Sequence, residues 1–200
     1  RRGRELGTAT VGIIGFGRIG QAVARRLSGF EARVYASDPF MTPEQISALG
    51  AVPSSPDEIA RECDIVTLHA PGGRTLADAA WVASARPGML LVNTARPDLV
   101  DEAVLAAALR SGGLGGYAAD TLNGDTAGSR DSPLLATDLA DRVVVTPHLG
   151  AQTVQAVDNM GRIAVQNALA VLEGVAPPNP VNSVPVGTPE PPASANAPSK

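Results

Sequence analysis

Six short apolar runs, separated by helix-like segments, restrict the possible folds of this chain more than any other feature. Most of the runs are apolar at every position rather than at every second one, which indicates strands buried on both faces. They cover residues 11–14, 33–36, 65–68, 89–92, 116–119 and 143–146. Strands that alternate with helices predict an α/β fold, a Rossmann doubly wound parallel sheet that binds ligands at the carboxyl ends of its strands.

Helix signals lie between the runs. Ile19, Val23 and Leu27 fall on one face of a helix that Gly29 would close. Prolines in the first turn indicate two more helices, beginning near residues 43 and 56. Asp101 is the expected N-cap of a further helix, whose apolar face consists of Val104, Leu105, Ala108 and Leu109.

The chain changes character after the last strand. Residues 150–173 have the pattern of one long helix, which Gly174 would end. Its candidate buried residues are Val154, Val157, Ile163, Val165, Leu169 and Leu172. Residues 177–200 are rich in Pro, Ser and Ala and poor in large apolar residues, so we expect a disordered tail. The expected division is a dinucleotide-binding Rossmann domain at 1–150, a long helix at 151–176 and the tail at 177–200.

Composition argues against several classes of function. The net charge is −4 and the sequence has no basic stripe, so nucleic acid and anionic membranes are not expected partners. No apolar run is long enough to span a bilayer. The lone cysteine, Cys63, allows no internal disulfide and fits a cytoplasmic location. Lys200 is the only lysine, so positive charge in a site must come from arginine. Because the chain begins with Arg1, we expect a fragment or a processed product.

A glycine-rich hexamer follows the first expected strand and opens the first expected helix. Gly15, Gly17 and Gly20 form a G-x-G-x-x-G pattern. The first glycine allows a tight turn, the second lets the backbone approach a pyrophosphate, and the third permits close packing of helix on sheet. The N–H groups at the helix N-terminus would face the phosphates, and Arg18 would add a charged contact. A glycine turn without a ligand is the alternative, but the flanking elements favour a dinucleotide site.

Asp38 ends the second expected strand, about twenty residues beyond the glycine turn. A carboxylate at this place binds the adenosine ribose hydroxyls and repels the extra phosphate of NADP, so the predicted cofactor is NAD. The alternative is that Asp38 only caps a turn, since Pro39 follows it.

Residues from about 8 to 182 resemble the D-isomer-specific 2-hydroxyacid dehydrogenases. Three stretches downstream of the glycine motif, and a closing segment, match the family in order and spacing. They are Leu68-His69-Ala70-Pro71, Val92-Asn93-Thr94-Ala95-Arg96 with Leu99-Val100-Asp101-Glu102, Thr146-Pro147-His148-Leu149-Gly150, and Asn179-Pro180-Val181-Asn182. The third stretch, continued to Thr153, looks most like the phosphoglycerate dehydrogenase branch. The resemblance implies a homodimeric oxidoreductase that moves hydride between NAD(H) and a 2-hydroxy or 2-keto acid.

The resemblance also implies three catalytic residues. Arg96 would hold the substrate carboxylate through two parallel hydrogen bonds, and His148 would exchange a proton with the carbonyl oxygen. Asp125 stands where the family has a glutamate and would orient His148. The cofactor would be bound by Gly15, Gly17, Arg18, Ile19, Gly20, Asp38, His69, Ala70, Pro71, Thr94, Ala95 and Asp120. No metal ligand is expected.

Three departures from the family pattern bear on activity. Asp125 is one methylene shorter than the family's glutamate, and beside Gly124 it equally fits a simple turn. Pro97 stands where the family places glycine, and it pushes Arg96 into an extended conformation. Only about ten residues precede the first strand, so the N-terminal substrate-binding domain of the family is largely missing.

Two further hypotheses stay open. The first is an NAD-binding sensor or scaffold protein without catalysis, which Asp125, Pro97 and the missing domain support. The second is a Rossmann domain attached to other chemistry, which the joint presence of the Arg96 and His148 motifs weakens. The side chain of the substrate is not encoded in these residues.

Overall fold

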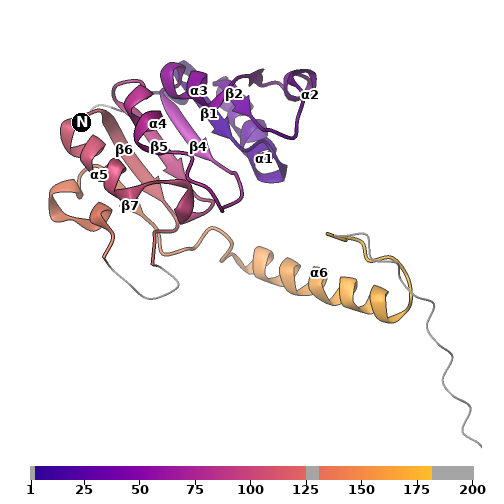
Figure 1. The fold of residues 1–200 in the computed structure, drawn as a ribbon. Helices are drawn as coiled ribbons and strands as arrows, with labels where there is room; N and C mark the ends of the chain where they lie inside the picture. The colour runs from indigo at the N-terminus through magenta and orange to yellow at the C-terminus, as the bar shows by residue number, and fades with distance from the viewer. Residues whose placement is uncertain (1–2, 125–130, 182–200) are drawn as a thin grey trace, which may run out of the picture. The chain divides into compact units, whose positions relative to one another are not determined.

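The computed structural model describes residues 3–124 and 131–181 of the chain (Figure 1). By its contacts the chain divides into two units, residues 1–148 and 149–200. The first unit contains the sheet and every expected site residue, of which Asp125 lies outside the described residues. The tail expected at 177–200 lies outside them from residue 182 on.

The first unit is built on one parallel sheet, as the alternating pattern predicts. Its strands are β1 (Thr10–Ile14), β2 (Arg33–Ser37), β3 (Val52–Pro53), β4 (Ile65–Leu68), β5 (Met89–Asn93), β6 (Leu114–Ala119) and β7 (Val143–Val145). They lie in the order β3-β2-β1-β4-β5-β6-β7, and every pairing is parallel. This is the doubly wound Rossmann arrangement, in which the order reverses direction between β1 and β4.

One strand was absent from the expected set of six. Strand β3 has only two residues and pairs with β2 at the edge of the sheet. Such a short segment leaves no readable pattern, and Pro53 is tolerated there because an edge strand needs no second ladder of hydrogen bonds.

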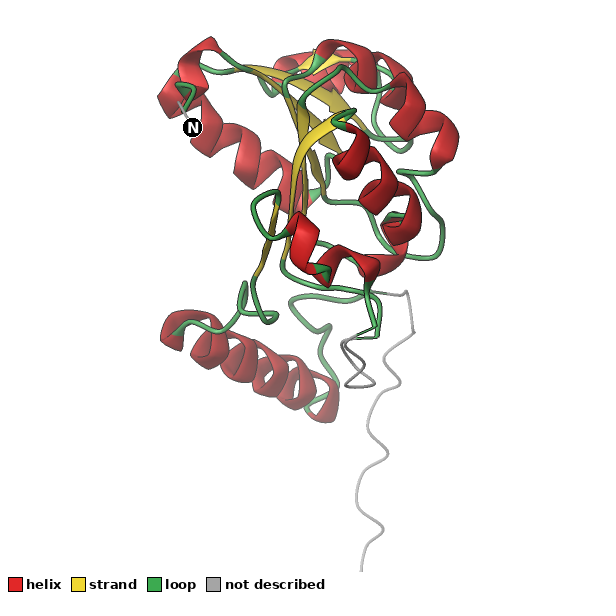
Figure 2. Cartoon of the chain, turned by 90° about the vertical axis from the view of Figure 1, so that its left-hand side faces the viewer, coloured by secondary structure: helices red, strands yellow, loops and turns green. Residues whose placement is uncertain are grey.

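Helices cover both faces of the sheet (Figure 2). They are α1 (Arg18–Leu27), α2 (Pro43–Ala48), α3 (Pro56–Glu62), α4 (Ala79–Ser84) and α5 (Glu102–Ser111), with α6 (Val154–Leu172) in the second unit. Capping boxes on Thr42 and Ser55 begin α2 and α3, and the Asp101 carboxylate accepts from two backbone N–H groups to begin α5. Helix α4, which the sequence did not predict, is one short Ala-rich segment capped by Asp78.

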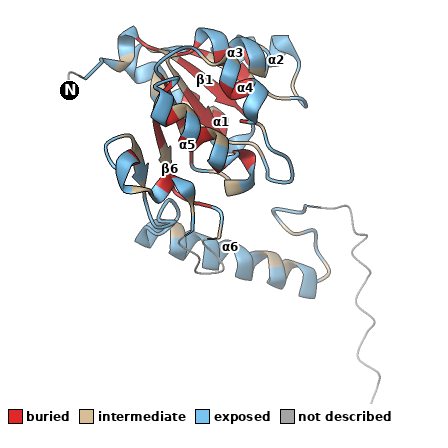
Figure 3. Ribbon diagram, turned by 60° about the vertical axis from the view of Figure 1, so that its left-hand side comes forward, coloured by how far each residue is buried: buried red, intermediate tan, exposed pale blue. Residues whose placement is uncertain are grey.

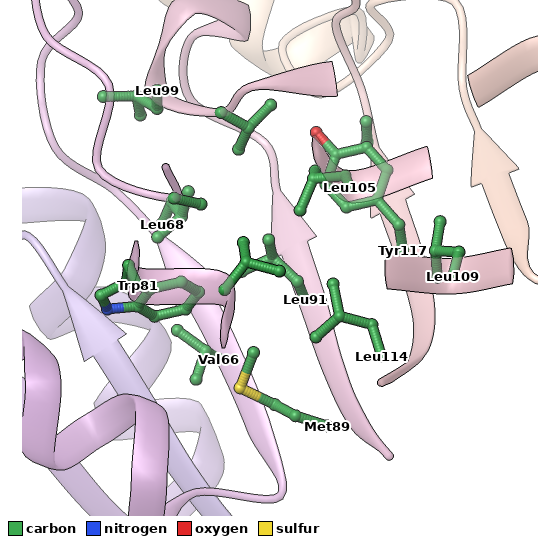
Figure 4. Close-up of a cluster of buried hydrophobic side chains, with 14 of the residues drawn as sticks. Val66, Leu68, Trp81, Met89, Leu91, Leu99, Leu105, Leu109, Leu114 and Tyr117 are labelled. Carbon is green, nitrogen blue, oxygen red and sulfur yellow. The ribbon is translucent and has the colours of Figure 1, made fainter. Parts of the chain in front are cut away.

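The larger of two hydrophobic clusters lies on the face covered by α3, α4 and α5 (Figures 3 and 4). There Leu105 and Leu109 of α5 are fully buried, together with Val66, Leu68 and Leu91 from the strands. The smaller cluster places Ala24 of α1 and Ile46 of α2 against strand residues of β1 and β2. Because few aromatic residues are available, aliphatic side chains fill most of this interior.

The expectation that the strands are buried on both faces is wrong for part of the sheet. Leu90 of β5 is 44% exposed between two buried neighbours, and Val144 of β7 is 65% exposed. Helix α1 packs over β1 and β2, while α5 packs on the opposite face. Within the described part of residues 1–148, no helix therefore covers β5 to β7 on the α1 side.

Helix α6 confirms the long helix pattern but not its burial. The helix begins at the N-cap Thr153, whose side chain accepts from the N–H of Ala156, and none of its residues is buried. The expected core positions are all exposed: Val154, Val157, Ile163, Val165, Leu169 and Leu172. Apolar periodicity identifies the face that a helix offers for packing, but a second surface is needed to bury it. No helix in the described residues is long and apolar enough to cross a membrane.

Replacing Leu105 with alanine tests the larger cluster. Leu105 is fully buried, so Leu105→Ala should lower the free energy of unfolding by about 2–5 kcal/mol, measured by urea denaturation with circular dichroism. The matched control is Leu172→Ala on α6, where the side chain is 78% exposed. The control should change stability by less than about 0.5 kcal/mol. Equal losses in the two variants would contradict this account of the core.

Candidate functional site

The sheet register brings the strand ends to a common level. Ser37 pairs beside Ile14, Ile14 beside Leu68 and Leu68 beside Asn93. The same row continues through Ala119 to Val145. The residues that follow this row begin the loops at the carboxyl edge, where doubly wound sheets bind their ligands. The glycine turn, Asp38, His69, Thr94, Asp120 and His148 all come within three residues of it.

The glycine turn connects β1 to α1 through a very close backbone approach. Gly15 has φ +92°, and a Cβ there would lie 2.5 Å from the backbone nitrogen of Ala70. A Cβ on Gly20 would overlap the carbonyl oxygen of Gly15. Gly17, in contrast, is exposed and would have no atom within 4 Å of its Cβ. Two glycines are therefore required by packing inside the protein, while Gly17 leaves open space outside the turn.

The N-terminus of α1 is free to bind an anion. Its N-cap is Gly17, which has no side chain to accept from the first-turn N–H groups. Arg18 and Ile19 are exposed, and Ile19 remains 65% accessible although it is apolar. Together with the open space at Gly17, this arrangement fits the pyrophosphate of a dinucleotide.

Asp38 is tied to the glycine turn and also caps the turn after β2. Its Oδ2 accepts from the N–H of Phe16 at 2.7 Å, and its Oδ1 accepts from the N–H of Phe40 at 2.9 Å. Both interpretations of this residue are thus compatible, because two carboxylate oxygens offer about four acceptor sites and only two are used here. The remaining lone pairs can accept from the hydroxyls of a ribose.

A cavity of about 350 Å³ lies at the carboxyl ends of β1, β2 and β4. Ala70 and Pro71, both expected to line the cofactor, line it together with Gly15 and Asp38. Sequence reasoning missed the other lining residues, and two of them, Phe40 and Arg74, carry large side chains. Both follow a recognised site residue by two or three positions, and that proximity was the only available signal.

His69 is half-buried beside Thr67. Its Nε2 lies 3.0 Å from the Thr67 Oγ1, and burial lowers the pKa of the imidazole. A neutral ring is therefore favoured near neutral pH. The backbone of His69, by contrast, contacts the glycine turn, with its carbonyl oxygen 2.7 Å from the Cβ position of Gly15. This backbone contact limits the space around the glycine turn.

Asn93 holds the loop that carries Arg96. Asn93 is fully buried, its Oδ1 accepts from the N–H of Ala95 at 3.1 Å, and its Nδ2 donates to the carbonyl of Arg96 at 2.8 Å. The Arg96 backbone is extended, at φ −137° and ψ 139°, as the following Pro97 requires. Pro97 opens a 3₁₀ turn without positive φ, so the proline is compatible with this loop. Thr94 and Arg96 are exposed at the edge of the sheet.

The loops after β6 and β7 are tied to each other beside His148. The Thr146 hydroxyl donates to the buried Asp120 carboxylate, and the His148 N–H donates to the Asp120 carbonyl at 2.9 Å. His148 has φ +55°, a left-handed conformation that is uncommon for a residue with a side chain. The His148 side chain is exposed at the end of β7, two strands from the Arg96 loop.

Fold and glycine turn together define a dinucleotide-binding domain of the Rossmann class. A sequence profile of the family described as "D-isomer specific 2-hydroxyacid dehydrogenase, NAD binding domain" matches residues 1–150. The chain belongs to this family, and its cofactor is NAD.

Individual relatives agree with the family assignment. D-3-phosphoglycerate dehydrogenase of Mycobacterium leprae (strain TN) is 39% identical over 183 residues, which cover 90% of this chain and 34% of the relative. Glyoxylate reductase of Thermococcus onnurineus (strain NA1) is 34% identical over 185 residues, which cover 90% of this chain and 53% of the relative. The chain therefore spans a third to a half of the curated relatives that it matches. The first similarity supports the phosphoglycerate dehydrogenase-like branch.

Solved structures show the same fold. D-lactate dehydrogenase with NAD+ from Lactobacillus jensenii matches with a TM-score of 0.79 and 29% identity, over 90% of this chain and 58% of that one. The TT0316 protein from Thermus thermophilus matches with a TM-score of 0.79 and 36% identity, over 90% of this chain and 56% of that one. The remainder of each structure has no counterpart in these residues.

Removing the Asn93 amide tests how the Arg96 loop is held. Asn93→Ala should lower the free energy of unfolding by about 1–3 kcal/mol, because it leaves the Ala95 N–H and the Arg96 carbonyl without their partner. Urea denaturation measures the loss. Asn93→Asp is the matched variant, since it keeps an acceptor for Ala95 and removes only the donor to Arg96. Stability unchanged in Asn93→Ala would show that water replaces the amide and that the loop does not depend on it.

Proposed function

We propose that the protein is an oxidoreductase acting on the CH–OH group of donors, which moves hydride between NAD(H) and a 2-hydroxy or 2-keto acid. The observation that carries the proposal is the common level of the strand ends, which puts the glycine turn and the loops of Arg96 and His148 at one edge of the sheet. Cofactor and substrate must meet at such an edge. The family supports the same chemistry.

Arg96 binds the substrate carboxylate in this proposal. A guanidinium offers two parallel N–H donors that match a carboxylate, and it remains charged at any physiological pH. One of its N–H groups donates to the carbonyl of Ala95 at 2.8 Å, which leaves other donors available. The Asn93 amide steadies the backbone from which this side chain extends.

His148 acts as the acid and base. An imidazole gives a proton to the carbonyl oxygen during reduction and removes it during oxidation. The hydrogen bonds from its N–H to the carbonyls of Asp120 and Thr146 fix the backbone that carries the ring. Asp125 is proposed to orient this ring, and it lies outside the described residues.

NAD is held by the chain through three features. The glycine turn and the free N-terminus of α1 receive the pyrophosphate, Asp38 receives the ribose hydroxyls, and the residues around Pro71 line the adenosine end. Bound NAD(H) donates or accepts the hydride, a reaction that no side chain performs. Thr94, Ala95 and Asp120 are proposed to line the nicotinamide end of the site. Pairing into a homodimer and a cytoplasmic location stay predictions.

A sensor or scaffold protein that binds NAD without catalysis is the alternative. It is supported by two departures from the family pattern, Asp125 and Pro97. Groups that exclude water from the substrate commonly come from a second domain that closes over the first. The two proposals share the cofactor site and differ only in turnover.

The cofactor preference tests the role of Asp38. Calorimetric titration should show saturable NADH binding, with NADPH at least about tenfold weaker, because the carboxylate repels the additional phosphate. Asp38→Asn keeps a hydrogen-bond acceptor for Phe16 and removes the charge, so it should reduce the difference between the NADH and NADPH affinities. Asp158→Ala, on α6, is the control for a lost surface charge. A difference that Asp38→Asn leaves intact would remove Asp38 from the selection of the cofactor.

Turnover tests the catalytic assignment. The oxidation of NADH is followed with a series of 2-keto acids that includes glyoxylate. His148→Ala should lower kcat by about 100-fold or more, and Arg96→Ala should raise KM strongly, while both variants retain NADH affinity. Turnover that survives His148→Ala unchanged would exclude histidine as the acid and base. NADH binding without turnover of any keto acid in the longest natural form of the protein would favour the sensor hypothesis.

A further inference from the structure

One carboxylate fixes the loop that follows β4. The Asp98 Oδ2 accepts from the N–H of Gly73 at 2.6 Å, and the Asp98 carbonyl accepts from the Thr75 hydroxyl at 3.3 Å. Just beyond, the N–H groups of Leu76 and Ala77 both donate to the carbonyl of the neighbouring Leu99. The backbone on both sides of Arg74 is thus bonded to the turn that follows β5.

Two glycines make this attachment possible. A Cβ on Gly72 would lie 2.7 Å and 2.9 Å from the two carboxylate oxygens of Asp98, so a side chain there would force the carboxylate away from the Gly73 N–H. Gly73 has φ +103°, a conformation that side chains rarely adopt. The two glycines therefore allow the backbone to approach the Asp98 carboxylate closely. Arg74 carries the first side chain after this hydrogen-bonded segment.

Arg74 lines the cavity of about 350 Å³ at the ends of β1, β2 and β4. It shares this lining with the apolar rings of Pro39, Phe40 and Pro71 and with the carboxylate of Asp38. Phe40 is 91% exposed, an unusual state for a phenyl ring. In the described residues no hydrogen bond or ion pair engages the Arg74 guanidinium.

These groups suit a flat heteroaromatic ring attached to a sugar diol. A guanidinium stacks its plane on an aromatic face, and proline and phenyl rings supply apolar surfaces beside it. The Asp38 carboxylate accepts from hydroxyls but repels a phosphate, so a phosphate is not the group that this cavity favours.

We propose that Arg74 binds the adenine ring of the cofactor by stacking, and that Asp98 is a positioning residue that holds the Arg74 loop over the cavity. The proposal rests on the assignment of the NAD site and adds two residues to it. Arg74 lies in the loop after β4, and Asp98 lies in the loop after β5, two residues beyond Arg96.

The proposed stacking is measured by how well adenosine and AMP displace bound NADH from the chain. The 200-residue chain is titrated with adenosine and with AMP, which differ only in the phosphate. Arg74→Ala should weaken both by about five- to tenfold, because the contact is with the base. Arg74→Lys keeps the charge but loses the planar guanidinium. Its affinity for adenosine should fall between those of the unaltered chain and Arg74→Ala. Arg25→Ala on α1 is the control and should change neither.

Asp98 is tested through a double-mutant cycle. Asp98→Ala should weaken adenosine binding in the unaltered background but add nothing in the Arg74→Ala background, because Asp98 acts through Arg74. Asp98→Asn keeps an acceptor for the Gly73 N–H and should restore most of the affinity. A loss in Asp98→Ala that is independent of Arg74 would overturn the positioning role.

Other outcomes separate this proposal from the cofactor assignment. Adenosine and NADH binding that Arg74→Ala leaves unchanged would overturn the stacking contact while retaining the NAD site. A loss seen with AMP but not with adenosine would assign Arg74 to a phosphate, and a loss confined to NADPH would assign it to the 2′ position. Both would overturn the stacking role. An unaltered chain that is folded and binds neither adenosine nor NADH would overturn the cofactor site as well.

Discussion

The close approach of three backbone segments around Gly15 is the constraint on which the rest of the site depends. The first turn of α1 packs on the Gly15 carbonyl only because Gly20 has no Cβ, and the His69–Ala70 backbone fits against Gly15 for the same reason. These contacts fix where α1 begins and how near the loop after β4 lies to the turn after β1. The open space at Gly17 and the cavity beside Asp38 follow from them.

Short polar side chains stabilise each loop at the carboxyl edge. Asp38 binds the backbone after β1 and β2, and Asn93 and Asp98 bind the loops after β5 and β4. Thr146 and Asp120 join the last two strands in the same way. Each of these bonds satisfies a polar group that helices and strands leave unpaired, and it also limits the conformations of the loop. A rigid edge of this kind is what a site needs if small shifts of a guanidinium or imidazole are to matter.

Several apolar surfaces of this chain are exposed. Leu90 and Val144 are open on one face of the sheet, and the apolar positions of α6 are open along the helix. The curated relatives are longer, since this chain covers 34% and 53% of two of them.

Periodicity, caps and the glycine motif determined most of the fold from sequence alone. Local geometry, which a few neighbouring residues specify, determines six of the strands, the Asp101 cap and the first-turn prolines of α2 and α3. It also determines the glycine turn with Asp38. Strand β3 is too short to leave a pattern of its own, and helix α4 lacks the first-turn proline that marked α2 and α3. Only tertiary structure decided the rest: the exposure of Leu90 and of α6, the partial burial of His69 and the bond between Asp98 and Gly73. Each of these depends on which distant segment arrives at the residue, and no local pattern carries that information.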